Sequence, residues 1–194
     1  ALSNVGRVYC WGANASGQLG QGDTVARYVM TPVTINANTY PIVKLYTNSS
    51  QESNSLLASF WAIDNQGQVW AWGDNTGGQL GNGFTGGNYY TPQHVGSGLF
   101  QSRGVTKLSA GSMSSSGSTM AAIDSTGQLW TWGVNGVGQL GQNNGNVALN
   151  TPTQVSGMTN VIDVIARNIT TSGAIIALKS DKTVWAAGNG IIIG

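Results

Sequence analysis

Residues 67–81 read Gly-Gln-Val-Trp-Ala-Trp-Gly-Asp-Asn-Thr-Gly-Gly-Gln-Leu-Gly, and this phrase organises the whole chain. A close copy occupies residues 127–141, a more altered copy residues 6–20, and a shortened fourth copy residues 183–189. The Thr-Pro pairs that follow the first three copies are 60 residues apart. Periods of this length are typical of propellers and repeat arrays, so we expect one recurring structural unit.

Each repeat is expected to contain four short strands. In the second repeat the first strand covers residues 42–45, the second 56–63 and the third 69–72, and the fourth begins at Thr91 and its following proline. The Asp-Asn-Gln-Gly turn over residues 64–67 is hairpin chemistry, because glycine accepts a positive φ without strain. The matching strands of the other repeats are expected at 105–108, 118–123, 161–164 and 174–178.

The third strand of each repeat carries one bulky and one small face. Side chains alternate between the two faces of a strand, so Trp70 and Trp72 share one face while Val69 and Ala71 share the other. Neither face is charged, which predicts that both are covered. Blades stacked around an axis satisfy this requirement, with the bulky face of one blade against the small face of its neighbour.

The Gly-Gln-Leu-Gly quartet closes each phrase, at residues 17–20, 78–81 and 138–141. Its two glycines predict a tight loop with positive φ angles. We expect the leucine to fill an apolar gap and the glutamine amide to satisfy backbone groups of the loop. The proline of the Thr-Pro pair fits an outer edge strand, where a missing N–H does least harm.

The phrase and the Thr-Pro pair together resemble the regulator-of-chromosome-condensation repeat, whose members build seven-bladed β-propellers. The resemblance implies an all-β chain with propeller-like blades of four antiparallel strands, here a partial propeller of about 3.3 repeats. We expect one unit over residues 1–194. It divides into the end of a blade (1–41), two blades (42–104 and 105–160) and the start of another (161–194).

The chain departs from the family pattern in two ways. The family often places Gly-x-x-His before the second strand, whereas residues 111–117 read Gly-Ser-Met-Ser-Ser-Ser-Gly and contain no histidine. Seven blades would also need about twice this length. We therefore expect apolar blade faces to be exposed at both ends, where other copies of the chain or the rest of a longer chain would cover them.

Composition excludes several classes of function. Only 8% of the residues are charged and the net charge is +1, without a basic stripe, which argues against a nucleic-acid partner. No apolar stretch approaches the ~20 residues of a membrane-spanning helix, so no membrane insertion is expected. With a single Cys and a single His, Cys10 and His94, a zinc site of the usual type cannot be assembled.

The acidic residues of the repeats are expected to stabilise turns and not to form a catalytic site. Asp23, Asp64, Asp74 and Asp124 fall at turns, where aspartate caps backbone N–H groups, although a calcium or catalytic role stays open. Cys10 aligns with small strand residues and is expected to be buried. The sequence thus predicts no catalytic residue, no metal and no cofactor.

Recognition residues are expected where the repeats differ, between the quartet and the Thr-Pro pair. Aromatic and basic side chains in these segments are frequent binding anchors. The alternative is that the aromatic rings cover the apolar flank of the outer strand. The candidate binding residues are Arg27, Tyr28, Phe84, Tyr89 and Tyr90.

Low charge and neutral polar loops favour a non-enzymatic structural or recognition module of a phage fibre, another virion surface or a bacterial adhesin. This predicts an extracellular or virion-surface location and a protein or cell-surface glycan as partner. The alternative, implied by the resemblance, is an intracellular protein-binding scaffold or a guanine-nucleotide exchange factor.

Overall fold

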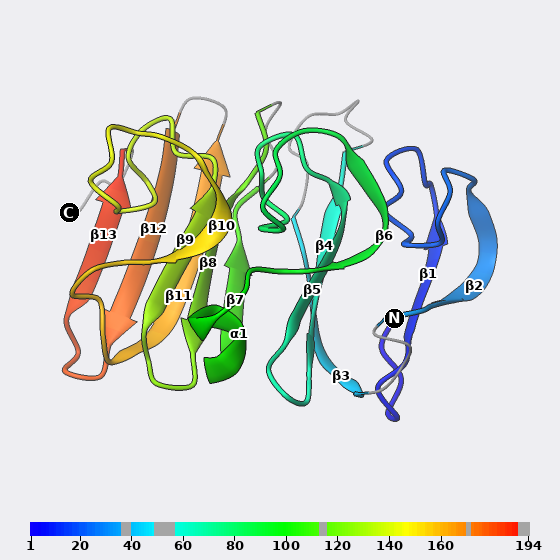
Figure 1. The fold of residues 1–194 in the computed structure, drawn as a ribbon, viewed down its shortest axis with the longest axis horizontal. Coiled ribbons are helices and arrows are strands. Elements are labelled where there is room, and N and C mark those ends of the chain that lie inside the picture. The colour runs from blue at the N-terminus through cyan, green and yellow to red at the C-terminus, as the bar shows by residue number, and fades with distance from the viewer. Residues whose placement is uncertain (36–39, 49–56, 113–115, 170–171, 190–194) are drawn as a thin grey trace.

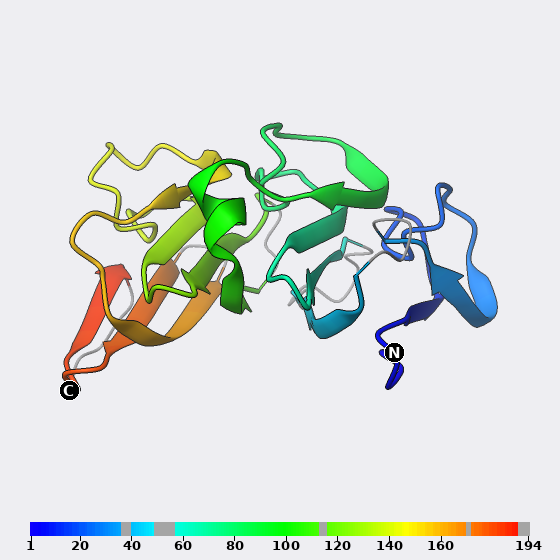
Figure 2. The same ribbon diagram turned by 60° about the horizontal axis from the view of Figure 1, so that its bottom comes forward.

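The computed structural model describes residues 1–35, 40–48, 57–112, 116–169 and 172–189. In these residues the chain forms four antiparallel β-sheets that lie side by side in chain order (Figures 1 and 2). The strands, with the short helix α1, are β1 (Val8–Gly12), β2 (Arg27–Val33), β3 (Ile42–Thr47), β4 (Ser59–Asp64), β5 (Val69–Asp74), β6 (Asn88–His94), α1 (Leu99–Arg103), β7 (Val105–Ala110), β8 (Thr119–Asp124), β9 (Leu129–Gly133), β10 (Leu149–Gln154), β11 (Val161–Ile169), β12 (Ser172–Lys179) and β13 (Val184–Gly188).

The two central sheets are four-stranded blades in which strands adjacent in sequence are paired. Their orders are β3-β4-β5-β6 and β10-β9-β8-β7, and they are flanked by the two-stranded sheet β1-β2 and the three-stranded sheet β11-β12-β13. We number these sheets one to four along the chain. The architecture confirms the prediction of an all-β, partial propeller built from antiparallel blades.

Neighbouring sheets pack a bulky face against a small face. Trp132 of the third sheet lies in a buried cluster with Ala71 of the second sheet. Its indole N–H donates to the Gln79 carbonyl oxygen of the second sheet at 2.9 Å. Trp72 makes the same 2.9 Å bond to the Gln18 carbonyl oxygen of the first sheet. A buried indole and one hydrogen bond therefore join each central sheet to the one before it.

The Gly-Gln-Leu-Gly loops have the predicted geometry. Gly78 and Gly81 have φ angles of 74° and 69°, and Leu80 is fully buried between them. The Gln79 side-chain oxygen accepts the Gly77 N–H at 2.8 Å. A Cβ atom on Gly81 would lie 2.8 Å from Nε1 of Trp132, so the indole uses the space that a side chain would need.

The fourth strand does not begin at the Thr-Pro pair. β6 starts at Asn88, and Tyr89 pairs with Gly73 before the register shifts. Thr91 and Pro92 lie in this irregular part of an edge strand, where the absent proline N–H costs little. The Thr-Pro pair in the sequence indicates the irregular part of β6 but not the pairing with β5 that begins before it.

Other elements also differ from those expected. The all-β pattern of the sequence gives no sign of a helix, but α1 forms and inserts Phe100 between sheets, with its ring centroid 5.4 Å from that of Trp130 and 5.7 Å from that of Trp132. β11 continues to Ile169 and does not end at residue 164. The start of the second strand of the second repeat, at residue 56, lies outside the described residues.

Apolar side chains are exposed on the outward faces of the first and fourth sheets, as expected. Trp11 stands in β1 where Trp72 and Trp132 stand in the central sheets, but it is 50% exposed. The outward face of the fourth sheet exposes Ile165, Ile176 and Val184.

Candidate protein-binding surface

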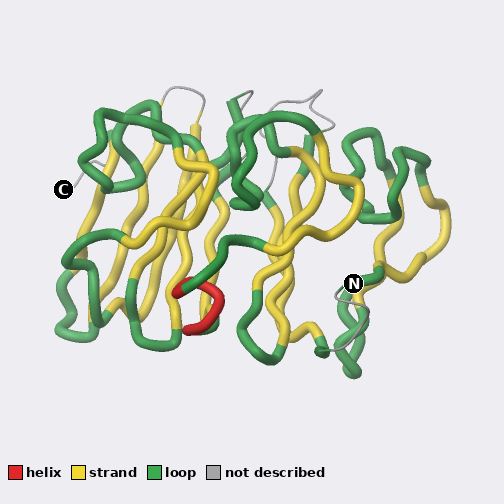
Figure 3. The backbone as a smooth tube through the Cα atoms, in the orientation of Figure 1, coloured by secondary structure: helices red, strands yellow, loops and turns green. Residues whose placement is uncertain are grey.

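The β1–β2, β5–β6 and β9–β10 connections, which follow the three complete copies of the repeated phrase, gather at one edge of the molecule. They form the loops at the top of Figures 1 and 3, whereas α1 lies at the opposite edge. Each connection contains a buried asparagine, whose side-chain oxygen accepts the backbone N–H of the quartet leucine. These bonds run to Asn14, Asn75 and Asn135 at 2.9, 3.0 and 2.9 Å.

The same asparagines hold the tips of the loops. The side-chain NH₂ groups of Asn14, Asn75 and Asn135 donate to the carbonyl oxygens of Val25, Phe84 and Val147 at 3.2, 3.0 and 3.0 Å. The backbone of each tip is thus fixed while its side chain points away from the core.

One apolar side chain on each tip is open to solvent. Val25, Phe84 and Val147 are 61%, 63% and 58% exposed, and we call these three residues the loop-tip row. Only Phe84 was predicted as a site residue. The two valines were missed because aliphatic residues carry no recognition signal, and the number of residues from asparagine to tip differs between repeats.

Arg27 and Tyr28 lie beside the first tip. Arg27 donates to the Val25 carbonyl oxygen at 2.6 Å and pairs with Asp23 at 2.6 Å. The hydrogen bond from Arg27 holds the pKa of Asp23 below its usual value. Tyr28 is 94% exposed on β2. Arg27 therefore helps to hold the tip, while Tyr28 is the more available of the two side chains.

Tyr89 and Tyr90 take part in packing between sheets. Tyr89 packs against the cluster between the second and third sheets. The Tyr90 carbonyl oxygen accepts the Gly22 N–H of the first sheet at 2.7 Å, and the Tyr90 ring covers Gly17. Asn150 holds the same place in the third sheet, where it exchanges hydrogen bonds with Gly83. This placement favours the flank-covering alternative for the two tyrosines and leaves Phe84 as the open aromatic ring at a loop tip.

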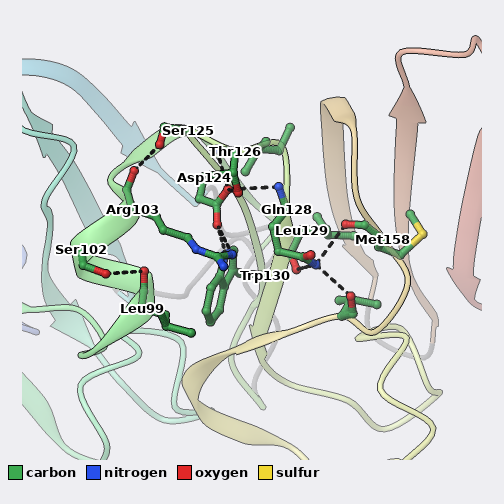
Figure 4. Close-up of polar contacts among 12 residues, drawn as sticks. Leu99, Ser102, Arg103, Asp124, Ser125, Thr126, Gln128, Leu129, Trp130 and Met158 are labelled. Atoms are coloured by element: carbon green, nitrogen blue, oxygen red, sulfur yellow. Dashed lines mark hydrogen bonds and ion pairs between the residues drawn. The ribbon is translucent and has the colours of Figure 1, made fainter.

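Asp124 forms a polar network at the opposite edge (Figure 4). Its Oδ1 atom accepts the N–H groups of Thr126 and Gln128 at 2.9 and 3.0 Å, and its Oδ2 atom accepts the Trp130 indole N–H at 2.9 Å. Arg103 of α1 lies 3.4 Å from Oδ2. Burial raises the pKa of Asp124, but the hydrogen bonds outweigh it and hold the pKa below its usual value. The carboxylate is therefore a turn cap, as expected, and it stays ionised at neutral pH.

Cys10 and His94 lie in different sheets. Cys10 is half-buried on β1, where burial raises the pKa of its thiol. The His94 ring packs on Trp70 with ring centroids 4.6 Å apart, and burial lowers its pKa so that it is neutral at pH 7. Among the described residues no group of three or more His, Cys, Asp or Glu side chains could hold a metal ion. No helix in the same part of the chain is long and apolar enough to span a bilayer.

Comparison with known proteins agrees with the repeat pattern. A family model described as the regulator of chromosome condensation (RCC1) repeat matches residues 5–45, 66–116 and 126–166. The human probable E3 ubiquitin-protein ligase HERC6 is 31% identical over 163 residues, which cover 83% of this chain and 14% of the ligase. Mouse protein RCC2 is 30% identical over 142 residues, 73% of this chain and 24% of RCC2. The chain thus spans less than a quarter of the length of either relative.

A solved structure shares the fold. Yeast RCC1 (Prp20), crystallised with Kap60 bound, superposes with a TM-score of 0.70 at 20% identity, covering 96% of this chain and 40% of its own. Prp20p of Saccharomyces cerevisiae, in a second structure with a TM-score of 0.69 at 20% identity and coverage of 96% of this chain and 41% of its own, was studied for its binding to Gsp1p and histones.

These relatives overturn the expected extracellular or virion-surface location. Ubiquitin ligases and a histone-binding protein are proteins of the cell interior, and no phage fibre or adhesin is among the relatives described above. The prediction was wrong because low charge and neutral polar loops describe how a surface is solvated and not where the protein resides. The three matches to the repeat model cover more than half of the sequence. The chain belongs to the regulator of chromosome condensation (RCC1) repeat family.

Proposed function

We propose that this chain is a protein-binding scaffold module of the cell interior and that it recognises its partner through the loop-tip row. The observation that carries the proposal is the repeated presentation of one exposed apolar side chain in each of the first three sheets, on a backbone fixed by a buried asparagine. Loops held in one conformation lose little entropy on binding.

The chemistry of this edge suits a protein partner. Apolar anchors within a neutral polar rim are the arrangement found at the centres of protein interfaces. The net charge of +1 offers no electrostatic footprint for a polyanion. The partners named for Prp20 are the proteins Kap60, Gsp1p and histones, which favours a protein partner over the predicted cell-surface glycan.

The test removes the row and keeps the fold. A triple variant, Val25→Ser, Phe84→Ser and Val147→Ser, is compared with the wild type and with Leu99→Ser, an equally exposed apolar site on α1 at the opposite edge. Captured proteins from a nuclear and cytosolic extract are quantified by mass spectrometry, and binding of Kap60, Gsp1p and core histones is measured directly.

We expect the wild type and Leu99→Ser to capture the same set of proteins. The triple variant should capture at least tenfold less of each of them. Equal capture by all three proteins would rule out the loop-tip row as the recognition surface. The exchange-factor alternative is tested separately, by the release of labelled GDP from Gsp1p. Accelerated release would replace the scaffold proposal with nucleotide exchange.

A further inference from the structure

The contact between the third and fourth sheets lacks the indole that joins the other sheets. Ala187 on β13 precedes Gly188, as Trp72 precedes Gly73 and Trp132 precedes Gly133. Ala187 pairs with Ile175 on β12, in the register in which Trp132 pairs with Met120. The repeat therefore places a methyl group where the preceding sheets place a tryptophan ring.

A cavity of about 410 Å³ lies at this position. Its walls come from the quartet loop and fourth-strand end of the third sheet and from β12 and β13 of the fourth. The residues that matter here are Gln139, Leu140, Gly141, Val155, Trp185 and Ala187.

The cavity corresponds to the site that the Trp132 indole fills between the second and third sheets, and we call such a site an indole cradle. Leu80, Gly81 and Val95 surround Trp132, and Leu140, Gly141 and Val155 are their counterparts in the cavity wall. A Cβ on Gly81 would lie 2.8 Å from the Trp132 indole, whereas a Cβ on Gly141 would meet nothing nearer than the Ala187 methyl at 3.4 Å. The difference is the space left by the missing ring.

The hydrogen-bond acceptor of the cradle is also retained. The Gln18 and Gln79 carbonyl oxygens accept indole N–H groups at 2.9 Å. Gln139 occupies the same quartet position, and in the described part of the chain no donor reaches its carbonyl oxygen. Trp185 adds an aromatic wall against which a flat ring can pack.

We propose that this cavity is a binding site for a small molecule with an indole-like bicyclic ring, whose N–H donates to the Gln139 carbonyl oxygen. The site is separate from the loop-tip row and does not depend on the proposed scaffold function. The occupant is defined by the protein itself, because two of its own indoles fill the equivalent cradles.

The probe is 5-fluoroindole, titrated against the chain and followed by ¹⁹F NMR. A ring of this size in an apolar pocket should bind with a dissociation constant of about 1 mM or below. 5-Fluorobenzothiophene, in which sulfur replaces the N–H, should bind about 2- to 10-fold more weakly, because it cannot donate the hydrogen bond. Contacts from the probe to the methyl groups of Ala187 and Leu140 in the wild type locate the site without any substitution.

Ala187→Trp is the blocking variant, since its own indole fills the cradle. We expect it to raise the melting temperature and to weaken 5-fluoroindole binding at least tenfold. The matched control is Val184→Trp, the same substitution on the same strand at an exposed position of the opposite face, which should keep wild-type affinity. Binding of N-acetyl-5-fluorotryptophanamide in addition to 5-fluoroindole would support the site and extend it to indoles of peptides, whereas binding of the free ring alone would restrict it to small molecules.

Three results would overturn the proposal. The first is no 5-fluoroindole binding by the wild type up to about 5 mM, well above the expected constant. The second is unchanged binding by folded Ala187→Trp, and the third is equal affinity for the benzothiophene.

Discussion

Tryptophan and glycine act as a pair at the contact between the first and second sheets and at the contact between the second and third. The glycine that ends a quartet leaves room for the indole of the following sheet, and the carbonyl of the quartet glutamine accepts its N–H. A change on either side of this pair therefore acts on the same contact.

Trp132→Ala is expected to lower the free energy of unfolding by about 3–5 kcal/mol, because it removes a fully buried ring and leaves a cavity. Urea denaturation measures this change. Trp11→Ala is the control, since the same residue type at the equivalent place in the first sheet is half-exposed and should cost much less. Equal losses for both variants would contradict the assignment of the indole as the joint between sheets.

Gly81→Ala and Gly141→Ala separate backbone strain from crowding. Their φ angles are 69° and 66°, so each substitution carries a similar backbone cost of about 1–2 kcal/mol. Only Gly81 also has an indole 2.8 Å from the added methyl group. We expect Gly81→Ala to be clearly the more destabilising in thermal unfolding, and an equal effect would mean that the two contacts are equally filled.

At the scale of the element, the turn between the second and third strands is closed by its capping residue. Asp64 and Asp124 both accept two turn N–H groups and the indole N–H of a tryptophan in the following strand. In the fourth sheet Lys179 stands in this place, and its ammonium group lies 5.7 Å from the centre of the Trp185 ring. A cation–π contact thus takes the place of the bond from the indole to the carboxylate, while Asp181 caps this turn by accepting the Thr183 N–H at 2.9 Å.

Asp124→Asn should lower the free energy of unfolding by about 1–3 kcal/mol at pH 7, because an NH₂ group would face donors that need an acceptor. The folded-state pKa of Asp124 lies below its usual value, so its contribution is present above about pH 4 and is lost as pH falls through the folded-state pKa. Denaturation between pH 3 and 7 should therefore show a shallower acid dependence for the variant. Asp181→Asn is the control: hydrogen bonds from Thr183 also lower the pKa of Asp181, but this carboxyl group is fully exposed, so solvent screening should keep its effect on the profile smaller.

The pattern of the sequence was sufficient for the elements that repeat and insufficient for those that do not. Gly67 and Gly127 predict the turns in which they lie. The alternation of bulky and small side chains around Trp72 predicts which face meets the neighbouring sheet. α1 depends on Phe100 reaching between sheets, which no local periodicity signals. The loop-tip row could not be predicted for the same reason. Each tip, such as Val147, is held by a buried asparagine, but the number of residues between the asparagine and the tip differs from repeat to repeat.

At the scale of the whole molecule, the two outward sheet faces are complementary. The first sheet presents the half-exposed Trp11 and the outward face of the fourth presents the exposed Val184 beside Ala186. These are the bulky and small faces that pack together inside the chain. We therefore expect copies of this chain to associate head to tail.

Sedimentation velocity over a range of concentrations tests this association. Val184→Lys should shift the distribution toward single chains, because a charge would be buried in an apolar contact. Leu99→Ser, away from both faces, should leave it unchanged. A wild-type chain that sediments as a single 20.1 kDa species at every concentration would contradict the prediction.

The fixed order of bulky and small faces gives the molecule a direction. The second sheet receives the Trp132 ring of the third and offers its own Trp72 ring to the first, so a copy of this blade inserted or deleted as a whole recreates the junctions already present. Interfaces of this heterologous kind either close on themselves or continue without limit. Blade number can therefore change by duplication without new interface chemistry, and the angle between successive blades then decides whether a closed ring or an open-ended filament results.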